Sequence, residues 1–150
     1  KRRLELVGTA HNIAVYDDFA HNPDKITASL STLREFSGRL LLFFQPHGFN
    51  PMKMMRAEMV ESFVKGMGDD DILIMPEIYY AGGTVERSIS SRDLIDDVVA
   101  AGKKARFFET RKECGDFLVE EAKKGDRIVI MGARDDTLTI FANQVLKALS

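Results

Sequence analysis

The feature that most constrains the fold is the alternation of short apolar runs with longer segments that carry helix signals. The runs are IAVYDDF, RLLLFFQ, DILIMPEIY, ARFFE and DRIVIMG, and a helical segment follows each of them. Nearly continuous apolar strands separated by helices are typical of a mostly parallel sheet that helices cover on both faces. The opening stretch, RLELVGTAHNIAVYDDF, differs because it indicates two strands around the polar TAHN. We therefore predict a doubly wound α/β fold with an N-terminal hairpin.

Capping signals locate the helices. The Asn-Pro pair at residues 22–23 supplies an N-cap and a proline suited to the first helical position. Two later segments open with capping boxes, Ser90 with Asp93 and Thr110 with Glu113. The predicted helices span residues 23–36, 52–67, 90–102, 110–124 and 136–149.

Size and charge exclude several classes of protein. The 150 residues suit a single domain over 1–150, and a net charge of −2 gives no electrostatic reason to expect nucleic acid or an anionic membrane as a partner. Cys114 is the lone cysteine, so an internal disulfide is excluded and a cytoplasmic location is compatible. No apolar run reaches the roughly 20 residues that span a bilayer, and no signal peptide opens the chain. Since the first residues already read as a strand and lack an initiator methionine, we expect a fragment of a longer chain.

The sequence lacks the parts of a complete catalytic site. It contains no GxxxxGK[ST] loop, no GxGxxG after a strand and no nucleophile elbow. His11, His21 and His47 are scattered, and Cys114 lies in a predicted helix, so no metal-ligand spacing is present. We assign no catalytic residue and no metal ligand. If the chain handles a nucleotide, its phosphates must be held elsewhere; the missing phosphate loop also disfavours a flavodoxin-like domain.

Four loops follow the predicted parallel strands, and all are polar, glycine-bearing or both. They read DDFAHNP, PHGFNPMK, YAGG and ARDD. Ligands of open α/β sheets bind at the carboxyl ends of the strands, so these loops are the candidate site. Loops are polar in any case, so this pattern alone does not decide between a binding site and ordinary surface.

The segments RRLELVG, DDFAHNP, FQPHGFNP, EIYYAGG followed by SS, and VIMGARD occur in an order that resembles the C-terminal domain of the Mur ligases. Within that family they are most like the UDP-N-acetylmuramate–L-alanine ligases, and the likeness runs from Arg2 to about Ala142. The resemblance implies a Rossmann-like third domain of a three-domain, ATP-dependent ligase of peptidoglycan biosynthesis in the cytoplasm. ATP and magnesium would be bound mainly by the missing central domain, so the isolated fragment is expected to be inactive.

The resemblance also implies partners and nucleotide contacts. The partners would be the other domains of the same chain, a UDP-N-acetylmuramate-type substrate, and an amino acid or peptide. Arg3 matches the arginine near the ribose, although it could be a solvated strand residue. Asp18 matches the aspartate that takes the ribose hydroxyls, for which a carboxylate offers only acceptors. His21 matches the histidine near the nucleotide, with capping of the helix entry as the alternative, and Asp17 could cap local backbone.

The substrate loops depart from the family pattern. Gly48 and Pro51 stand where the alanine-adding ligases have arginines, so Lys53, or Arg56 in the following helix, would supply the cation. We assign substrate binding to His47, Asn50 and Lys53 in this loop, and to Gly132 and Asp136 in the last one. The alternative for Asp136, or for Asp135, is to cap the final helix.

Two other functions stay open. A muropeptide-recycling ligase has a DDFAHHP-like stretch and a Met-Lys pair after the second loop, but its last loop does not match VIMGARD. A degenerate homologue could instead keep the fold as a non-catalytic module that binds a nucleotide or a partner, which the missing arginines favour.

Overall fold

The computed structural model describes residues 3–79, 88–133 and 136–150. Within these ranges six strands form one sheet in the order β1-β2-β6-β3-β4-β5. All neighbours pair in parallel except β1 and β2, whose antiparallel hairpin turns through His11 and Asn12 with φ of 52° and 62°. Both values suit a two-residue hairpin loop. The predicted mostly parallel sheet and its N-terminal hairpin are confirmed. The strands are β1 Glu5–Ala10, β2 Ile13–Asp18, β3 Leu40–Gln45, β4 Ile72–Met75, β5 Lys104–Phe107 and β6 Arg127–Gly132.

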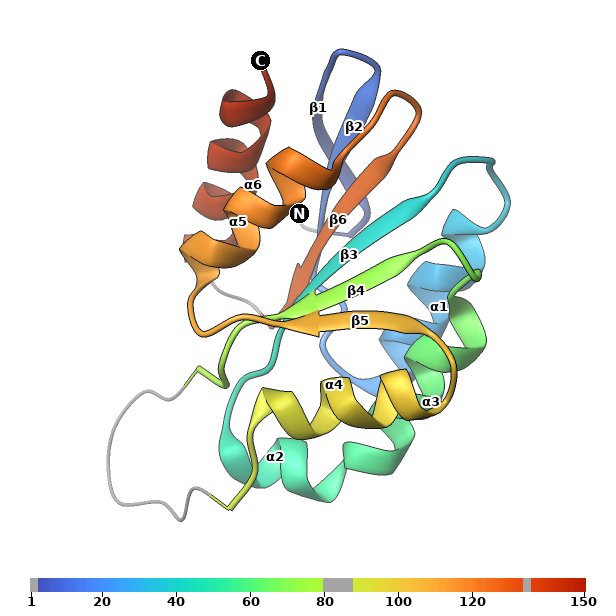
Figure 1. Cartoon of the computed structure of the whole chain (residues 1–150), viewed down its shortest axis with the longest axis vertical. Helices are drawn as coiled ribbons and strands as arrows, with labels where there is room; N and C mark the ends of the chain where they lie inside the picture. Colours follow the sequence, from blue (N-terminus) through green and yellow to red (C-terminus); the bar gives the residue numbers. More distant parts are fainter. Residues whose placement is uncertain (1–2, 80–87, 134–135) are drawn as a thin grey trace.

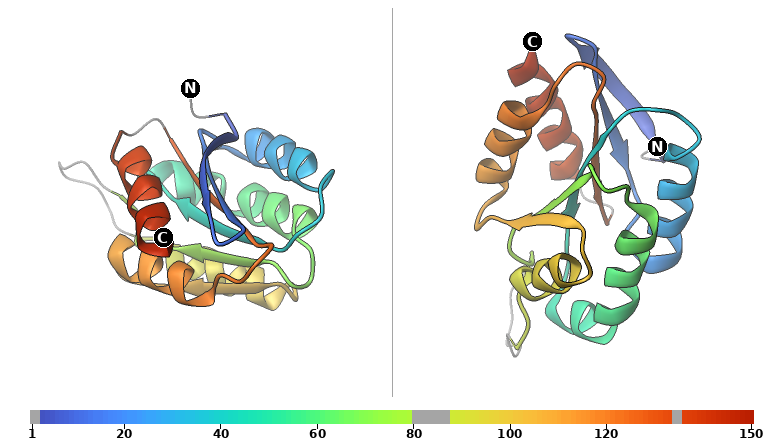
Figure 2. Two further views of the ribbon diagram at one scale, coloured as in Figure 1. Left: turned by 90° about the horizontal axis from the view of Figure 1, so that it is seen from above. Right: turned by 45° about the vertical axis from the view of Figure 1, so that its right-hand side comes forward.

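Helices cover both faces of the sheet, as predicted (Figure 1). The first four pack on one face and the last two on the other, which Figure 2 shows from above. Each face of the sheet has its own hydrophobic core, the first under the first four helices and the second under the last two. Alternate residues of β3 pack into them: Leu40, Leu42 and Phe44 face the first core, and Leu41 and Phe43 face the second. No described helix is long and apolar enough to cross a membrane. The helices are α1 Pro23–Leu33, α2 Phe49–Met54, α3 Arg56–Gly66, α4 Ser91–Ala100, α5 Arg111–Glu121 and α6 Asp136–Leu149.

The predicted caps are present, but one predicted helix is wrong. Asn22 caps α1, and Ser90 and Thr110 each head a reciprocal capping box. The single helix predicted over residues 52–67 is instead two helices, because Met55 leaves the helical region with φ −101° and ψ 11°. The first of them starts earlier than predicted, after Gly48, whose φ of 85° makes the turn into Phe49. Asn50, which was predicted to lie in the loop, therefore lies in the same helix as Lys53.

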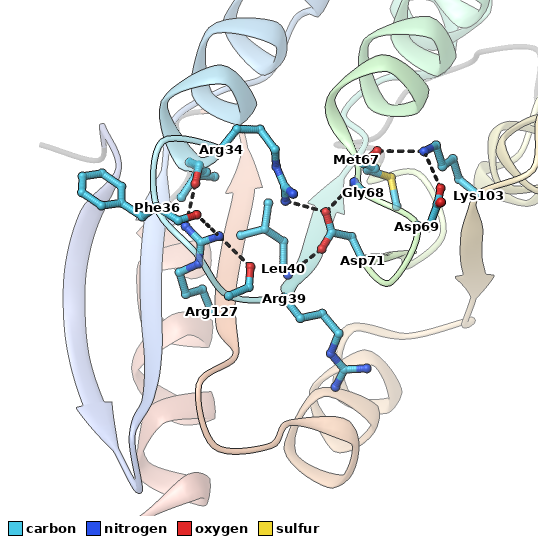
Figure 3. Close-up of polar contacts among 12 residues, drawn as sticks. Arg34, Phe36, Arg39, Leu40, Met67, Gly68, Asp69, Asp71, Lys103 and Arg127 are labelled. Carbon is cyan, nitrogen blue, oxygen red and sulfur yellow. Dashed lines mark hydrogen bonds and ion pairs between the residues drawn. The ribbon is translucent and has the colours of Figure 1, made fainter.

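Buried polar groups fasten the amino-terminal edge of the sheet (Figure 3). Asp71, just before β4, accepts from Arg34 and from the backbone N–H groups of Leu40 (2.8 Å) and Gly68 (2.7 Å). Arg127 opens β6 and donates to the carbonyls of Leu33, Phe36 and Gly38. Burial lowers the pKa of Arg127, and its bonds to carbonyls offset part of the cost of that burial. These contacts join α1, β3, β4 and β6 at the edge opposite the candidate site.

Replacing Asp71 with alanine is expected to destabilise the fold by about 2–4 kcal/mol, since one buried and one partly buried backbone N–H group and one guanidinium lose their acceptor. Urea unfolding of the 150-residue chain measures this loss. The control is Lys65→Ala, which removes an exposed (i,i+4) pair with Glu61 and is expected to change stability by less than about 0.5 kcal/mol. Equal stabilities of the two variants would contradict the role given to Asp71.

Cys114 on α5 makes stability depend on pH in the alkaline range. Burial, with a smaller contribution from Glu113, raises the pKa of the Cys114 thiol to about 12. The unfolded chain ionises this thiol near its ordinary pKa of about 8.5, so the folded state holds more protons above that pH and stability falls as pH rises. Between about pH 7.5 and 9.5 the wild type is expected to lose about 1.4 kcal/mol more than Cys114→Ala, measured by denaturant unfolding. Parallel curves for the two proteins would refute this.

Candidate functional site

Three strand ends meet at the carboxyl edge of the sheet and form the candidate site. β6 lies between β2 and β3, with Asp18 opposite Met131 and Gln45 opposite Gly132. The chain leaves β2 for α1 on one face and leaves β6 for α6 on the other. Loops that diverge in this way open the crevice in which doubly wound sheets bind ligands.

Asp18 ends β2 and lines a cavity of about 220 Å³ beside the start of α1. It is 1% exposed and accepts from the Leu4 N–H (3.0 Å) and from Ser29 Oγ (2.5 Å), which fix the orientation of its carboxylate. Arg3 and Lys25 also line this cavity. The structure therefore brings together Arg3 and Asp18, two of the three residues predicted to contact a nucleotide.

Asp17 points to the opposite face of the sheet, as adjacent strand residues must. Its carboxylate accepts from Thr139 Oγ1 of α6 at 2.8 Å and is 2% exposed. This bond links β2 to the last helix. The sequence suggested that Asp17 could cap local backbone; the structure shows in addition a contact with the Thr139 side chain of α6.

His21, the third predicted nucleotide contact, is not among the residues that line the Asp18 cavity. Its Nδ1 lies 3.0 Å from the Phe19 carbonyl, which can only accept, so the proton sits on Nδ1. The ring also packs against Phe19 with 4.8 Å between centroids. Asn22, and not His21, caps α1.

The second candidate loop is tied to the loop after β4. His47 stacks on Tyr79 at 4.9 Å between centroids, and the Gly48 N–H donates to the Tyr79 carbonyl at 3.0 Å. Asn50 and Lys53 are exposed on α2. The predicted YAGG loop lies outside the described residues.

Lys53 is the better candidate for the cation that this loop should supply. The alternative, Arg56, makes a forked pair with Asp97 of α4 at 2.7 and 3.1 Å, and this pair raises the pKa of Arg56. Its guanidinium is therefore committed to joining α3 and α4. In the described residues, Lys53 makes no ion pair.

The last candidate loop contains Gly132 and leads to Asp136. A side chain at Gly132 would put its Cβ 2.6 Å from Leu138 Cδ1 and 3.3 Å from Gln45 Cβ, so close packing requires glycine here. Asp136 is exposed and is the first residue of α6. Residue 135, the other candidate for capping this helix, lies outside the described residues. A carboxylate in the first turn is still favourable for the helix.

Two residues at this edge were missed from the sequence. Gln45 is 4% exposed, and its Nε2 donates to the carbonyls of Pro46 (3.0 Å) and Glu77 (3.1 Å). Arg111 of α5 donates to Gln45 Oε1 through Nε (3.2 Å) and Nη2 (3.1 Å), and to Thr137 Oγ1 through Nη1 (2.8 Å). The only sequence signals were a polar residue ending the apolar LLLFFQ and a cation in a helix's first turn, where the dipole disfavours it.

The site contains groups suited to a nucleoside. The Asp18 carboxylate suits sugar hydroxyls, and Arg3 and Lys25 provide positive charge beside it. Among the residues that the structure describes, no three His, Cys, Asp or Glu side chains gather to hold a metal ion.

The chain matches a family model and is similar to several known proteins. A family model described as Mur ligase, glutamate ligase domain, matches residues 2–134. A UDP-N-acetylmuramate–L-alanine ligase from Caldicellulosiruptor saccharolyticus is 33% identical over 135 residues, 89% of this chain and 29% of that protein. The chain spans 29–31% of the length of the curated relatives it matches.

Two solved structures extend this similarity to the fold. A murein peptide ligase from Psychrobacter arcticus matches with a TM-score of 0.76 at 25% identity, over 99% of this chain and 30% of that one. A domain of a Haemophilus ducreyi protein, described as a UDP-N-acetylmuramate:L-alanyl-γ-D-glutamyl-diaminopimelate ligase, matches with a TM-score of 0.71 at 25% identity. That match covers 99% of this chain and 100% of the other.

Proposed function

The chain belongs to the Mur ligase family as its glutamate ligase domain, and from this premise we propose that it is the C-terminal domain of a longer, three-domain, ATP-dependent ligase. The substrate would be a UDP-N-acetylmuramate-type carboxylic acid and the product its amide with an amino acid, as the name of the Caldicellulosiruptor relative indicates. The isolated 150 residues would then turn over no ATP, because their sequence has no phosphate-binding loop.

One observation carries this proposal: a buried, oriented carboxylate at the carboxyl end of a central strand. Asp18 is held by Leu4 and Ser29 and lines a cavity with Arg3 beside it. An oriented carboxylate pairs well with the vicinal hydroxyls of a ribose, and the cavity has room for a sugar ring. Asp18 would hold the ribose, and Arg3 would lie beside it.

The reaction would proceed through an acyl phosphate. The carboxylate of the sugar substrate attacks the γ-phosphorus of ATP and ADP leaves; the amine then attacks the acyl carbon and phosphate leaves. Magnesium, bound by another domain, would neutralise phosphate charge. This domain would contribute positioning and exclusion of water, both of which lower barriers substantially. Asp18 would orient the nucleotide, Lys53 would bind the carboxylate of the incoming amino acid, and Asp136 would hold its amine.

Asp18→Ala in the full-length protein is expected to raise the apparent KM for ATP by roughly 10- to 150-fold, the loss for charge-assisted hydrogen bonds worth about 1.5–3 kcal/mol. Asp17→Ala is the matched control, since it also removes a buried carboxylate from β2 but one bound to α6. Both variants are expected to be less stable. An apparent KM for ATP that rises equally in both variants, or in neither, would reject the assignment of Asp18.

Asp136→Asn and Lys53→Ala are expected to raise the apparent KM for the amino acid and leave that for ATP nearly unchanged. Each removes a charge that would bind one end of the amino acid, without a packing defect, because both side chains are exposed. Lys147→Ala in the last turn of α6 is the control. Steady-state kinetics with each substrate varied in turn decides the matter. Amino-acid constants equal to that of the wild type would end this assignment.

A second candidate is the transfer of a peptide in place of a single amino acid. The structural match to the murein peptide ligase of Psychrobacter arcticus favours it. Competition between L-alanine and the free tripeptide L-alanyl-γ-D-glutamyl-diaminopimelate, the peptide named for the Haemophilus ducreyi match, for the same acyl phosphate distinguishes the two: the true acceptor has the higher kcat/KM.

A further inference from the structure

Gln45 occupies the centre of the carboxyl edge. It ends β3, the strand between β6 and β4, and its register partner on β6 is Gly132. The side-chain amide donates to the carbonyls of Pro46 and Glu77, so its NH₂ group holds the chain that leaves β3 and the chain that leaves β4. Only the side-chain oxygen then faces α5, and it accepts from Arg111.

Arg111 extends these contacts to the last helix. Its Nε and Nη2 form a fork on Gln45 Oε1, and Nη1 donates to Thr137 Oγ1 at 2.8 Å. Thr137 follows Asp136 directly in the first turn of α6. Because a guanidinium is planar, a fork on one acceptor fixes the direction of the remaining N–H groups. Arg111 therefore connects the first turn of α6 to the end of β3.

These contacts join the two segments proposed to bind opposite ends of the amino acid. One is the β3–α2 connection, which starts directly after Gln45 and leads to Lys53. The other is the first turn of α6, which contains Asp136. The two helices pack on opposite faces of the sheet, α2 against the first core and α6 against the second, so direct helix–helix packing does not set their spacing. Arg111 and Gln45 supply a polar link between them.

We propose that Arg111 and Gln45 act together as positioning residues that set the geometry of the amino-acid end of the site. The proposal rests on the proposed ligase function, and it assigns a role to a residue of α5, a helix that contributes none of the predicted ligands. The pair determines the affinity for the incoming amino acid. It leaves nucleotide binding at Asp18, beside α1, unaffected.

The kinetic test uses Arg111→Ala and Arg111→Lys in the full-length protein, with ATP and the amino acid varied in turn. Arg111→Ala is expected to raise the amino-acid KM roughly 10- to 100-fold, because a misplacement of about 1 Å is enough for such a loss. Arg111→Lys is expected to rescue it only in part, since an ammonium cannot form the fork. The apparent KM for ATP is expected to stay within about twofold of the wild-type value. Lys112→Ala is the control, as it removes only an exposed pair with Asp116.

A second measurement needs no activity. In the ¹⁵N-labelled 150-residue chain, Arg111→Ala is expected to shift the amide signals of Gly48 and Phe49, which Arg111 reaches through Gln45, and Lys112→Ala is not. Unchanged amino-acid KM, or ATP and amino-acid constants that rise together with a lower Tm, would overturn the positioning role. A full-length wild type that forms no amide product from the two substrates would overturn the proposed function instead. In that case, backbone NMR shifts confined to the neighbours of Arg111 would also overturn the connection from Arg111 through Gln45 to Gly48.

Discussion

The insertion of β6 between β2 and β3 is the constraint on which the rest of the structure depends. The last strand of the chain pairs with β2 over Ala14–Asp18 and with β3 over Leu40–Gln45, and all six of its residues are buried. Without it, β2 and β3 would not belong to one sheet, and the ends that carry Asp18 and Gln45 would not be neighbours. Arg127, which bonds the α1–β3 connection, fixes where this strand begins.

The polar groups at the amino-terminal and carboxyl edges of the sheet have different partners, so the two edges have different roles. At the amino-terminal edge, Asp71 and Arg127 bind backbone groups of neighbouring elements, and Arg39 pairs with Asp126 at 2.7 Å. These contacts resist opening of the sheet. At the carboxyl edge, Asp18 lines a cavity, and Gln45 with Arg111 joins segments on both faces. One edge stabilises the sheet and the other is suited to binding.

Much of the fold was predictable because it depends on local signals. The hairpin, the parallel strands and the caps at Asn22, Ser90 and Thr110 were all predicted correctly. The break at Met55 was not, because no capping residue or proline marks it. The family resemblance was confirmed, whereas the binding roles of Asp18, Lys53 and the other site residues stay predictions.

The sequence by itself determined most of the strands and helices, though not the break at Met55, and it showed that Asp17, Asp18 and Gly132 lie at the ends of buried strands and that Asp136 follows one. Only the tertiary structure decided which face of the sheet each of these polar side chains points to and which residues it contacts there. The pleat sends Asp18 to Ser29 of α1 and Asp17 to Thr139 of α6, and the fork of Arg111 on Gln45 joins residues 66 positions apart. Such contacts depend on strand order, and no local pattern encodes strand order because the pairing energy is gained only when distant segments meet.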